Sequence, residues 1–94
     1  MSTNELFVIE SVDGIETVNA REIWKYVESK QDFSTWIKAR IKKYGFVEGE
    51  DYLTLHKKME RQILKEYHVS IDMAKELGMV EHNDKGREVR AHFI

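Results

Sequence analysis

The stretch that decides the fold runs from Phe33 to Tyr52 and reads FSTWIKARIKKYGFVEGEDY. Its apolar residues recur at the spacing of one helix face, and we expect them to pack in the core. They are Phe33, Trp36, Ile37, Ile41 and Tyr44. Asp32 or Ser34 can cap the start of this helix, and Gly45 suits its end because glycine readily adopts a left-handed conformation. The stretch therefore predicts one amphipathic helix over residues 33–44.

The same stretch concentrates positive charge in a chain whose formal net charge is only -2. Four cations fall within six positions: Lys38, Arg40, Lys42 and Lys43. Residues 35–65 hold eight Lys or Arg against four Asp or Glu, whereas residues 1–34 and 66–94 are both net negative. Because the local field matters more to encounter than the total charge, the middle third is the candidate surface for an anionic partner.

The N-terminal third predicts a hairpin followed by a short helix. The segments ELFVIESV and IETV flank Asp13-Gly14, a pair that readily takes the positive φ angles of a two-residue turn. Asn19 is expected to cap a helix from Ala20 to Glu28, with Glu22 completing a capping-box-like pair. A brief polar connector then leads to helix 33–44, so the two helices suggest a helix-turn-helix-like pair.

The centre of the chain predicts a second hairpin. Two strand-like runs, Tyr52–His56 and Ile63–Val69, flank the polar and basic segment HKKMERQ, which we expect to form a hairpin tip or wing. Ile63, Tyr67 and Val69 share one face of the second run, and Lys65 interrupts that face.

Two helices are expected after the second hairpin. Ser70 or Asp72 opens the first helix, whose apolar face is Met73, Ala74, Leu77 and Val80. The segment Asn83–Gly86 is expected to turn the chain into a last helical segment that carries Val89 and Phe93. The predicted fold is a small single α+β domain with an N-terminal β-hairpin, a helix-turn-helix-like pair, a central wing-like β-hairpin and two C-terminal helices.

Length and composition favour a binding role for this domain. Its 94 residues, 41% of them hydrophobic, suffice for one modest core and leave little stability for a deep catalytic cavity. The chain has no cysteine, which excludes disulfides, thiolate zinc sites and thiol nucleophiles and suits a reducing cytoplasm. Because the sequence has neither a signal-peptide pattern nor a long apolar run, we expect a soluble cytoplasmic protein with no membrane partner.

Motifs for catalysis or cofactor binding do not occur in the sequence. The four histidines show no metal-ligand spacing, the serines have no nucleophile-elbow context, and no glycine-rich phosphate-binding motif is present. We therefore expect neither an enzyme nor a bound metal or cofactor.

The lysines of helix 33–44 have two interpretations. Lys38, Lys42 and Lys43 can simply form a solvated face opposite the apolar stripe. Alternatively, they contact DNA phosphates or an acidic protein surface, and the hairpin cations would then extend the same positive surface. Those hairpin cations are Lys57, Lys58 and Arg61.

Arg40 differs from the lysines because its position falls within the apolar stripe. A guanidinium there must be paired. The first interpretation is a structural ion pair with an acid such as Glu22, Asp51 or Asp72. The second is an arginine presented at a domain or subunit interface.

Apolar residues also occur on more than one side of the last helical segment. Val89, Phe93 and Ile94 motivate the hypothesis of a homodimer or of docking by a further C-terminal domain.

Three blocks of the sequence, in this order, resemble the AntA/AntB antirepressor domain of phages and prophages. They are VNAREIWKYV, FSTWIKARIKKYGFVEGEDY and YHVSIDMAKELGMVEHNDKGREVRAHFI, which together cover nearly all of the chain from Val18 to Ile94. The segment HKKMERQILKEYH departs from this pattern, because it lacks the glycine-rich stretch that many relatives carry there. The resemblance implies a single domain over residues 1–94, either complete or the N-terminal domain of a longer protein.

The resemblance implies a regulator that relieves transcriptional repression by interacting with a phage repressor. The competing hypothesis is a winged-helix-like regulator that binds double-stranded DNA with basic helix 33–44 and hairpin 57–61. The two differ in salt dependence, because multiple phosphate contacts weaken steeply with salt and an apolar protein contact weakens less.

Overall fold

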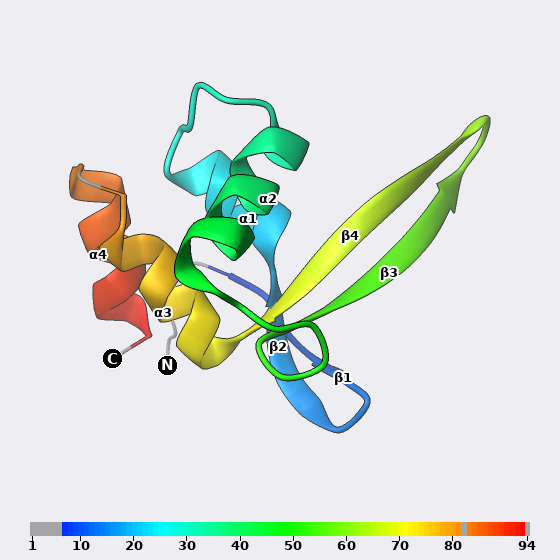
Figure 1. Cartoon of the computed structure of the whole chain (residues 1–94), viewed down its shortest axis with the longest axis horizontal. Helices are drawn as coiled ribbons and strands as arrows, with labels where there is room; N and C mark the ends of the chain where they lie inside the picture. The colour runs from blue at the N-terminus through cyan, green and yellow to red at the C-terminus, as the bar shows by residue number, and fades with distance from the viewer. Residues whose placement is uncertain (1–6, 82, 94) are drawn as a thin grey trace.

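The computed structural model describes residues 7–81 and 83–93, and it confirms the predicted small α+β fold. The described residues form four helices and one four-stranded sheet (Figure 1). In chain order the elements are β1 (Ile9–Val12), β2 (Ile15–Asn19), α1 (Ala20–Tyr26), α2 (Phe33–Tyr44), β3 (Tyr52–Met59), β4 (Gln62–Ser70), α3 (Ile71–Met79) and α4 (Asp84–His92).

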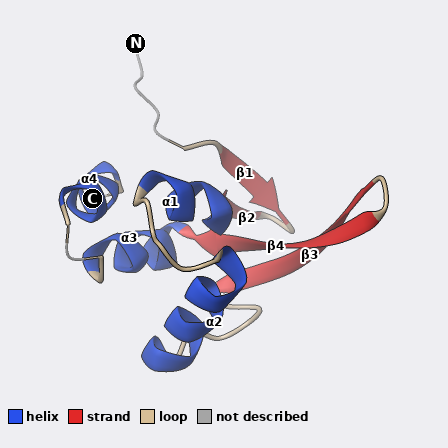
Figure 2. Ribbon diagram, turned by 90° about the horizontal axis from the view of Figure 1, so that it is seen from above, coloured by secondary structure: helices blue, strands red, loops and turns tan. Residues whose placement is uncertain are grey.

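The sheet has the strand order β1-β2-β4-β3, and every neighbouring pair is antiparallel. Val18 of β2 lies opposite Val69 of β4, and both are fully buried beneath the helices. Tyr67 points to the same face, because side chains two residues apart in a strand share a face. The core therefore lies between this face of the sheet and the helices, with α4 packed on α3 (Figures 1 and 2).

The central hairpin is longer than the sequence predicted. β3 continues through Met59 and β4 begins at Gln62, so the turn is limited to Glu60 and Arg61. The pair projects beyond the helices as an arm (Figure 1). Ile63 shares the face of Tyr67 and Val69, but it lies on this arm outside the core and is 65% exposed.

The N-terminal hairpin forms around Asp13 and Gly14, with φ angles of 52° and 79°, which confirms the predicted turn. Its first strand is shorter than expected, because regular pairing begins at Ile9. Phe7 instead enters the core, where its ring stacks on Phe93 at 5.7 Å between ring centroids. Glu5 and Leu6, which belong to the predicted strand, lie outside the described residues.

Local capping sets the ends of the first two helices. The Asn19 side chain accepts a hydrogen bond from the Arg21 N–H at 2.8 Å, and α1 ends at Tyr26, short of the predicted Glu28. Asp32, and not Ser34, caps α2 by accepting from the Thr35 N–H at 3.0 Å. Gly45, at φ 70°, ends α2 in the left-handed conformation, as predicted.

The apolar stripe of α2 is buried along most of its length. Trp36 and Ile37 are fully buried, and Ile41 is half-buried against the core. The prediction that Tyr44 belongs to the core is wrong, because this residue is 41% exposed. It occupies the last turn of α2, where the helix has passed the sheet and its neighbours, and its ring lies beside Phe46.

The turn between α3 and α4 differs from the predicted one. Ser70, and not Asp72, caps α3. Asn83 caps α4 by accepting from the Gly86 N–H at 2.7 Å, so residues 84–86 form its first turn instead of a loop. Val89 is fully buried and Phe93 is 9% exposed, so neither supplies the outward face on which the dimer hypothesis was based. Ile94 lies outside the described residues.

The helices α3 and α4 approach each other closely at two buried glycines, Gly78 and Gly86. A Cβ atom at Gly78 would lie 2.8 Å from the Arg90 backbone nitrogen and 2.9 Å from the Gly86 carbonyl oxygen. A Cβ atom at Gly86 would meet the backbone and side chain of Glu81. Both positions therefore require glycine for backbone proximity, since both φ angles are ordinary for a helix.

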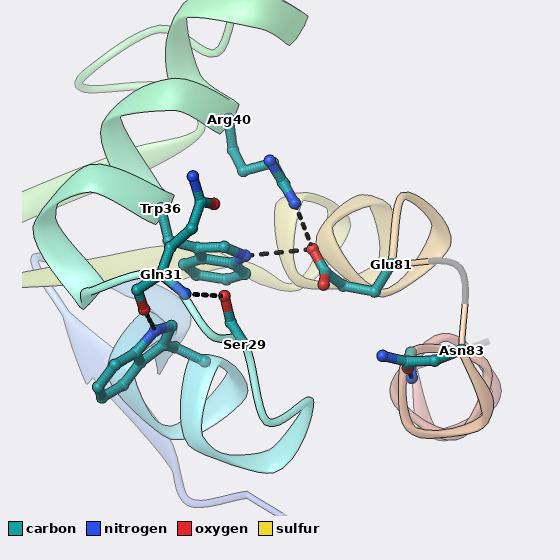
Figure 3. Close-up of polar contacts among 8 residues, drawn as sticks. Ser29, Gln31, Trp36, Arg40, Glu81 and Asn83 are labelled. Atoms are coloured by element: carbon teal, nitrogen blue, oxygen red, sulfur yellow. Dashed lines mark hydrogen bonds and ion pairs between the residues drawn. The ribbon is translucent and has the colours of Figure 1, made fainter.

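This close approach places Glu81 beside α2. One carboxylate oxygen, Oε2, accepts from Arg40 Nη2 at 2.7 Å and from the Trp36 indole Nε1 at 3.1 Å (Figure 3). The Arg40 and Glu81 side chains are 22% and 10% exposed. Arg40 is therefore paired within the fold, and its partner is Glu81 instead of the three acids considered from the sequence.

A second polar contact joins α1 to α4. The Tyr26 hydroxyl donates to the Glu88 carboxylate, and this hydrogen bond raises the pKa of Tyr26 above its ordinary value. The hydroxyl therefore keeps its proton, and continues to donate, further into the alkaline range than an ordinary tyrosine.

We predict that Gly78→Ala destabilises the domain, although alanine is the better helix former by roughly 1 kcal/mol. Overpacking against the α4 backbone costs about 1 to 3 kcal/mol, and this penalty should dominate. Thermal unfolding followed by circular dichroism measures the effect, with Met79→Ala as the control because Met79 is 50% exposed in the same helix. A melting temperature equal to or above that of wild type would contradict the close approach.

We also predict that Glu81→Ala lowers the free energy of unfolding by about 2 to 3 kcal/mol, because it leaves the Arg40 charge and the Trp36 N–H without their acceptor. The loss should be smaller after the double change Arg40→Leu with Glu81→Leu, which removes both charges. Urea unfolding measures both variants, with the exposed Glu76→Ala in α3 as the control. Equal losses for Glu81→Ala and Glu76→Ala would show that the pair contributes nothing.

Candidate functional site

The six cations proposed from the sequence to contact a partner are all exposed, but they lie in different parts of the molecule. Lys38 lies in the middle of α2, whereas Lys42 and Lys43 occupy its last turn. Lys57 and Lys58 lie on β3, and Arg61 lies in the turn at the end of the arm.

Strand geometry separates the two lysines of β3. Lys58 lies opposite Ile63. It therefore points to the face of the sheet on which the helices pack, although the helices do not reach this part of the arm. Lys57 lies opposite Leu64 and points to the other face of the sheet. The arm therefore presents positive charge on both of its faces.

The basic end of α2 lies away from the arm. The first residue of α2, Phe33, packs on Tyr67 of β4 with 5.9 Å between ring centroids. From there the helix runs away from the arm, so its last turn, with Lys42 and Lys43, lies at the far end (Figure 2). The six cations are thus divided among the helix end, the helix middle and the arm.

A groove lies between α1, the first half of α2 and the first half of β4, and we call it the helix-side groove. Its volume is about 540 Å³. Its lining includes Arg21, Trp24, Phe33, Lys38, Ile63, Lys65 and Tyr67. The aromatic side chains that line it are Trp24, Phe33 and Tyr67, of which Phe33 and Tyr67 are only 5% and 4% exposed, and Ile63 adds an exposed aliphatic side chain.

Cations lie around this aromatic surface. The Arg21 guanidinium lies 4.3 Å from the centroid of the Phe33 ring, and Lys65 Nζ lies 5.2 Å from that of Tyr67. Lys38 lines the same groove. The structure thus brings one of the six predicted cations, Lys38, together with Lys65 and Ile63, which were not predicted as site residues. The sequence did show that Ile63 and Lys65 share one strand face with Tyr67, and this pattern could have identified them.

Two of the ionisable groups in the helix-side groove already have partners within the fold. Thr35 donates its N–H and its hydroxyl to Asp32, which holds the pKa of that carboxyl below its ordinary value. Asp32 is therefore charged at neutral pH and engaged as the cap of α2. Arg21 is paired with Glu66 at 2.9 Å. Lys38 and Lys65 remain as the cations that can meet an acidic partner here.

On β3, the Tyr52 ring lies 5.9 Å from that of Tyr67, one of the residues that line this groove. Burial raises the pKa of Tyr52 above its ordinary value, and nearby Glu48 contributes.

The opposite face of the sheet carries a second hollow, which we call the sheet-side groove, with a volume of about 530 Å³. Leu55, Met59 and Leu64 give it apolar surface. Its polar lining includes Glu10, Asn19, Arg21, Lys57, Glu66 and His68. Sequence analysis assigned no function to these residues apart from Lys57, because their proximity depends on the pairing of β4 with both β2 and β3.

The described residues show neither a metal-binding cluster nor a membrane-spanning helix. No group of three or more His, Asp or Glu side chains among residues 7–81 and 83–93 is placed to hold a metal ion. Within the same residues, no helix has the length and apolar character needed to cross a membrane.

Comparison with known proteins identifies the family. The family model described as AntA/AntB antirepressor matches residues 18–83, from within β2 to the residue that caps α4. No curated protein and no solved structure gives a significant match. Because the matched region covers most of the 94 residues and includes both α2 and the β3–β4 arm, the chain belongs to the AntA/AntB antirepressor family.

Proposed function

We propose that this chain is a phage or prophage antirepressor that binds a repressor protein and thereby relieves transcriptional repression. Membership of the AntA/AntB antirepressor family supports the regulatory role. The repressor and its operator are found in the cytoplasm of the bacterial host, so the chain would act there. The role requires binding, not catalysis.

The observation that carries this proposal is the composition of the helix-side groove. An exposed aliphatic residue, Ile63, lies beside aromatic side chains, with Lys38 and Lys65 around them. An apolar centre with a charged rim is the usual arrangement of a protein-protein interface. A segment of the repressor with apolar residues flanked by Asp or Glu would match this groove.

The remaining cations would act at longer range. Lys42 and Lys43 at the end of α2, and Lys57, Lys58 and Arg61 on the arm, are exposed and lie outside the groove or at its margins. Charges in such positions accelerate the encounter with an oppositely charged partner more than they stabilise the complex. We assign them to steering an acidic repressor surface.

Direct binding to double-stranded DNA by α2 and hairpin 57–61 is the competing function. Phosphate contacts need several cations along one accessible surface. Lys57 and Lys58 point to opposite faces of the arm, and Lys42 and Lys43 lie at the end of α2 far from it. The arrangement therefore supports a protein partner better than a duplex.

We predict that Ile63→Asp strongly impairs release of a repressor from its operator. The repressor to use is the one encoded nearest to this gene, pre-bound to its fluorescent operator, with anisotropy as the measurement. The variant should weaken repressor binding at least tenfold, because removing a side chain at the centre of an interface typically costs about 2 kcal/mol or more. Met79→Asp changes an apolar residue that is 50% exposed and lies outside the groove, and it serves as the control.

Charge reversal at the end of α2 should act differently. The double change Lys42→Glu with Lys43→Glu should slow association at low salt. The difference in association rate from wild type should disappear at about 0.5 M salt, because screening removes electrostatic steering. Stopped-flow measurement of operator release separates this rate effect from the affinity effect of Ile63→Asp. If wild type leaves the repressor on its operator, the antirepressor proposal is wrong. Tight, steeply salt-dependent binding of the chain to duplex DNA would favour the competing function.

A further inference from the structure

The backbone of β4 is paired on only one of its two edges along the arm. β2 pairs with the last part of β4 and ends where Asn19 lies opposite His68, because the chain then turns into α1. On the other edge, β3 pairs with β4 as far as Gln62. Over residues 62–67, no strand among the described residues pairs with the edge of β4 on the β2 side. We call this segment the free edge of β4.

The strand register shows which backbone groups point to the free edge. Residues next to each other in an antiparallel strand direct their N–H and C=O groups to opposite edges. The Ser70 N–H donates at 2.8 Å to the carbonyl oxygen of Asp51, which immediately precedes β3. The even-numbered residues of β4 therefore face β3, and Ile63 and Lys65 direct their backbone groups to the free edge. Both residues are exposed, so a partner can reach these groups.

The helix-side groove runs along the free edge of β4. Its lining includes three consecutive residues of β4, namely Ile63, Leu64 and Lys65. Consecutive side chains point to opposite faces of a strand, so a groove that meets all three lies along the edge of the strand. Across the groove lie α1 and α2, which contribute Arg21 and Lys38, and β4 is the strand of the arm nearer α2 (Figure 1). The groove thus has unpaired backbone as one of its walls.

Arg21 closes the inner end of the free edge. Its Nε donates to Glu66 at 2.9 Å, and its guanidinium lies 4.3 Å from the centroid of the Phe33 ring. Tyr67, the next residue of β4, is only 4% exposed. The accessible part of the free edge is therefore residues 62–65, between the turn of the arm and Arg21.

The side chains of the groove favour an apolar and acidic partner. A segment lying beside β4 would place one residue next to the exposed aliphatic side chain of Ile63. Two positions away, on the same face, another residue would lie next to Lys65, in the groove that Lys38 also lines. Arg21 is already paired and Asp32 caps α2, so the charges left in the groove are positive.

A partner that covers the free edge must also satisfy its backbone groups, because burying an N–H or C=O group without a hydrogen bond is costly. A helical segment satisfies its own backbone internally and would leave the groups of Ile63 and Lys65 unpaired. An extended segment can pair with both residues.

We propose that the repressor segment held in the helix-side groove is extended and adds as a strand to the free edge of β4, beside Ile63 and Lys65. Backbone hydrogen bonds hold the segment, and its side chains supply selectivity through an apolar residue and an Asp or Glu two positions apart. The added strand continues the line of β2 along β4. This inference rests on the proposed function, because it specifies how the same groove holds the repressor.

Amide hydrogen exchange, measured by NMR on the wild-type chain, tests the proposal without a change of sequence. The probe is the repressor encoded nearest to this gene. On binding, the N–H groups of Ile63 and Lys65 should exchange at least about tenfold more slowly, because they acquire hydrogen bonds. His56 is the internal control, since it lies directly opposite Lys65 and directs its N–H to the outer edge of β3. Its exchange rate should not change.

A proline substitution tests the backbone contact separately. Lys65→Pro removes an N–H of the free edge and leaves the bonds to β3, which come from the neighbouring residues. Lys65→Ala removes the same side chain and keeps the N–H. Lys65→Pro should therefore weaken repressor binding at least about tenfold more than Lys65→Ala does. On the outer edge of β3, His56→Pro should bind as His56→Ala does. Circular dichroism checks that each variant is folded, and the exchange measurement decides the question if Lys65→Pro does not fold.

The outcomes separate this inference from the proposed function. A repressor that binds without slowing exchange at Ile63 and Lys65 overturns the strand addition and leaves the antirepressor proposal standing. Equal affinities of folded Lys65→Pro and Lys65→Ala have the same consequence. Slower exchange at His56 alone would place the partner on the outer edge of β3 and also overturn the inference. A repressor that does not bind at all overturns the proposed function and this inference together.

Discussion

A single carboxylate, that of Glu81, fixes the basic helix α2 to the rest of the fold. It accepts from the Trp36 indole and from Arg40, two groups one helical turn apart, so it sets both the position and the rotation of α2. The carboxylate reaches α2 because Gly78 and Gly86 let α3 and α4 approach closely and hold the α3–α4 corner in place. A rotated α2 would bury lysines and expose Trp36.

The placement of α2 shapes the helix-side groove. With Trp36 and Ile37 fully buried, Phe33 at the first turn lies against Tyr67, and the helix-side groove opens beside this contact. The arm continues past the helices with both of its faces accessible. One face carries Ile63 and Lys65, and the other carries Leu55 and Lys57, because neighbouring strand residues alternate. The two faces of one hairpin therefore carry different side chains.

The residues that we propose for binding were predicted unevenly. Lys38 was recognised because a charge run on an amphipathic helix is visible in the sequence. Ile63 was assigned to the face of Tyr67 and Val69, but its exposure depends on how far the arm extends past the helices. Glu66 was not assigned a role, because its neighbours come from elements that are distant in sequence. The partner of Arg40 was missed for the same reason, since Glu81 lies 41 residues away.

The sequence by itself determined the order of the elements and some of their ends, because these depend on contacts between residues close in the chain. The Asp13-Gly14 turn, the caps at Asn19 and Ser70 and the end of α2 at Gly45 all follow from side chains acting on nearby backbone. Only the tertiary structure decided which acid neutralises Arg40, which face each arm lysine occupies and which residues share a groove. These features depend on packing and register between segments far apart in sequence, which local spacing does not encode.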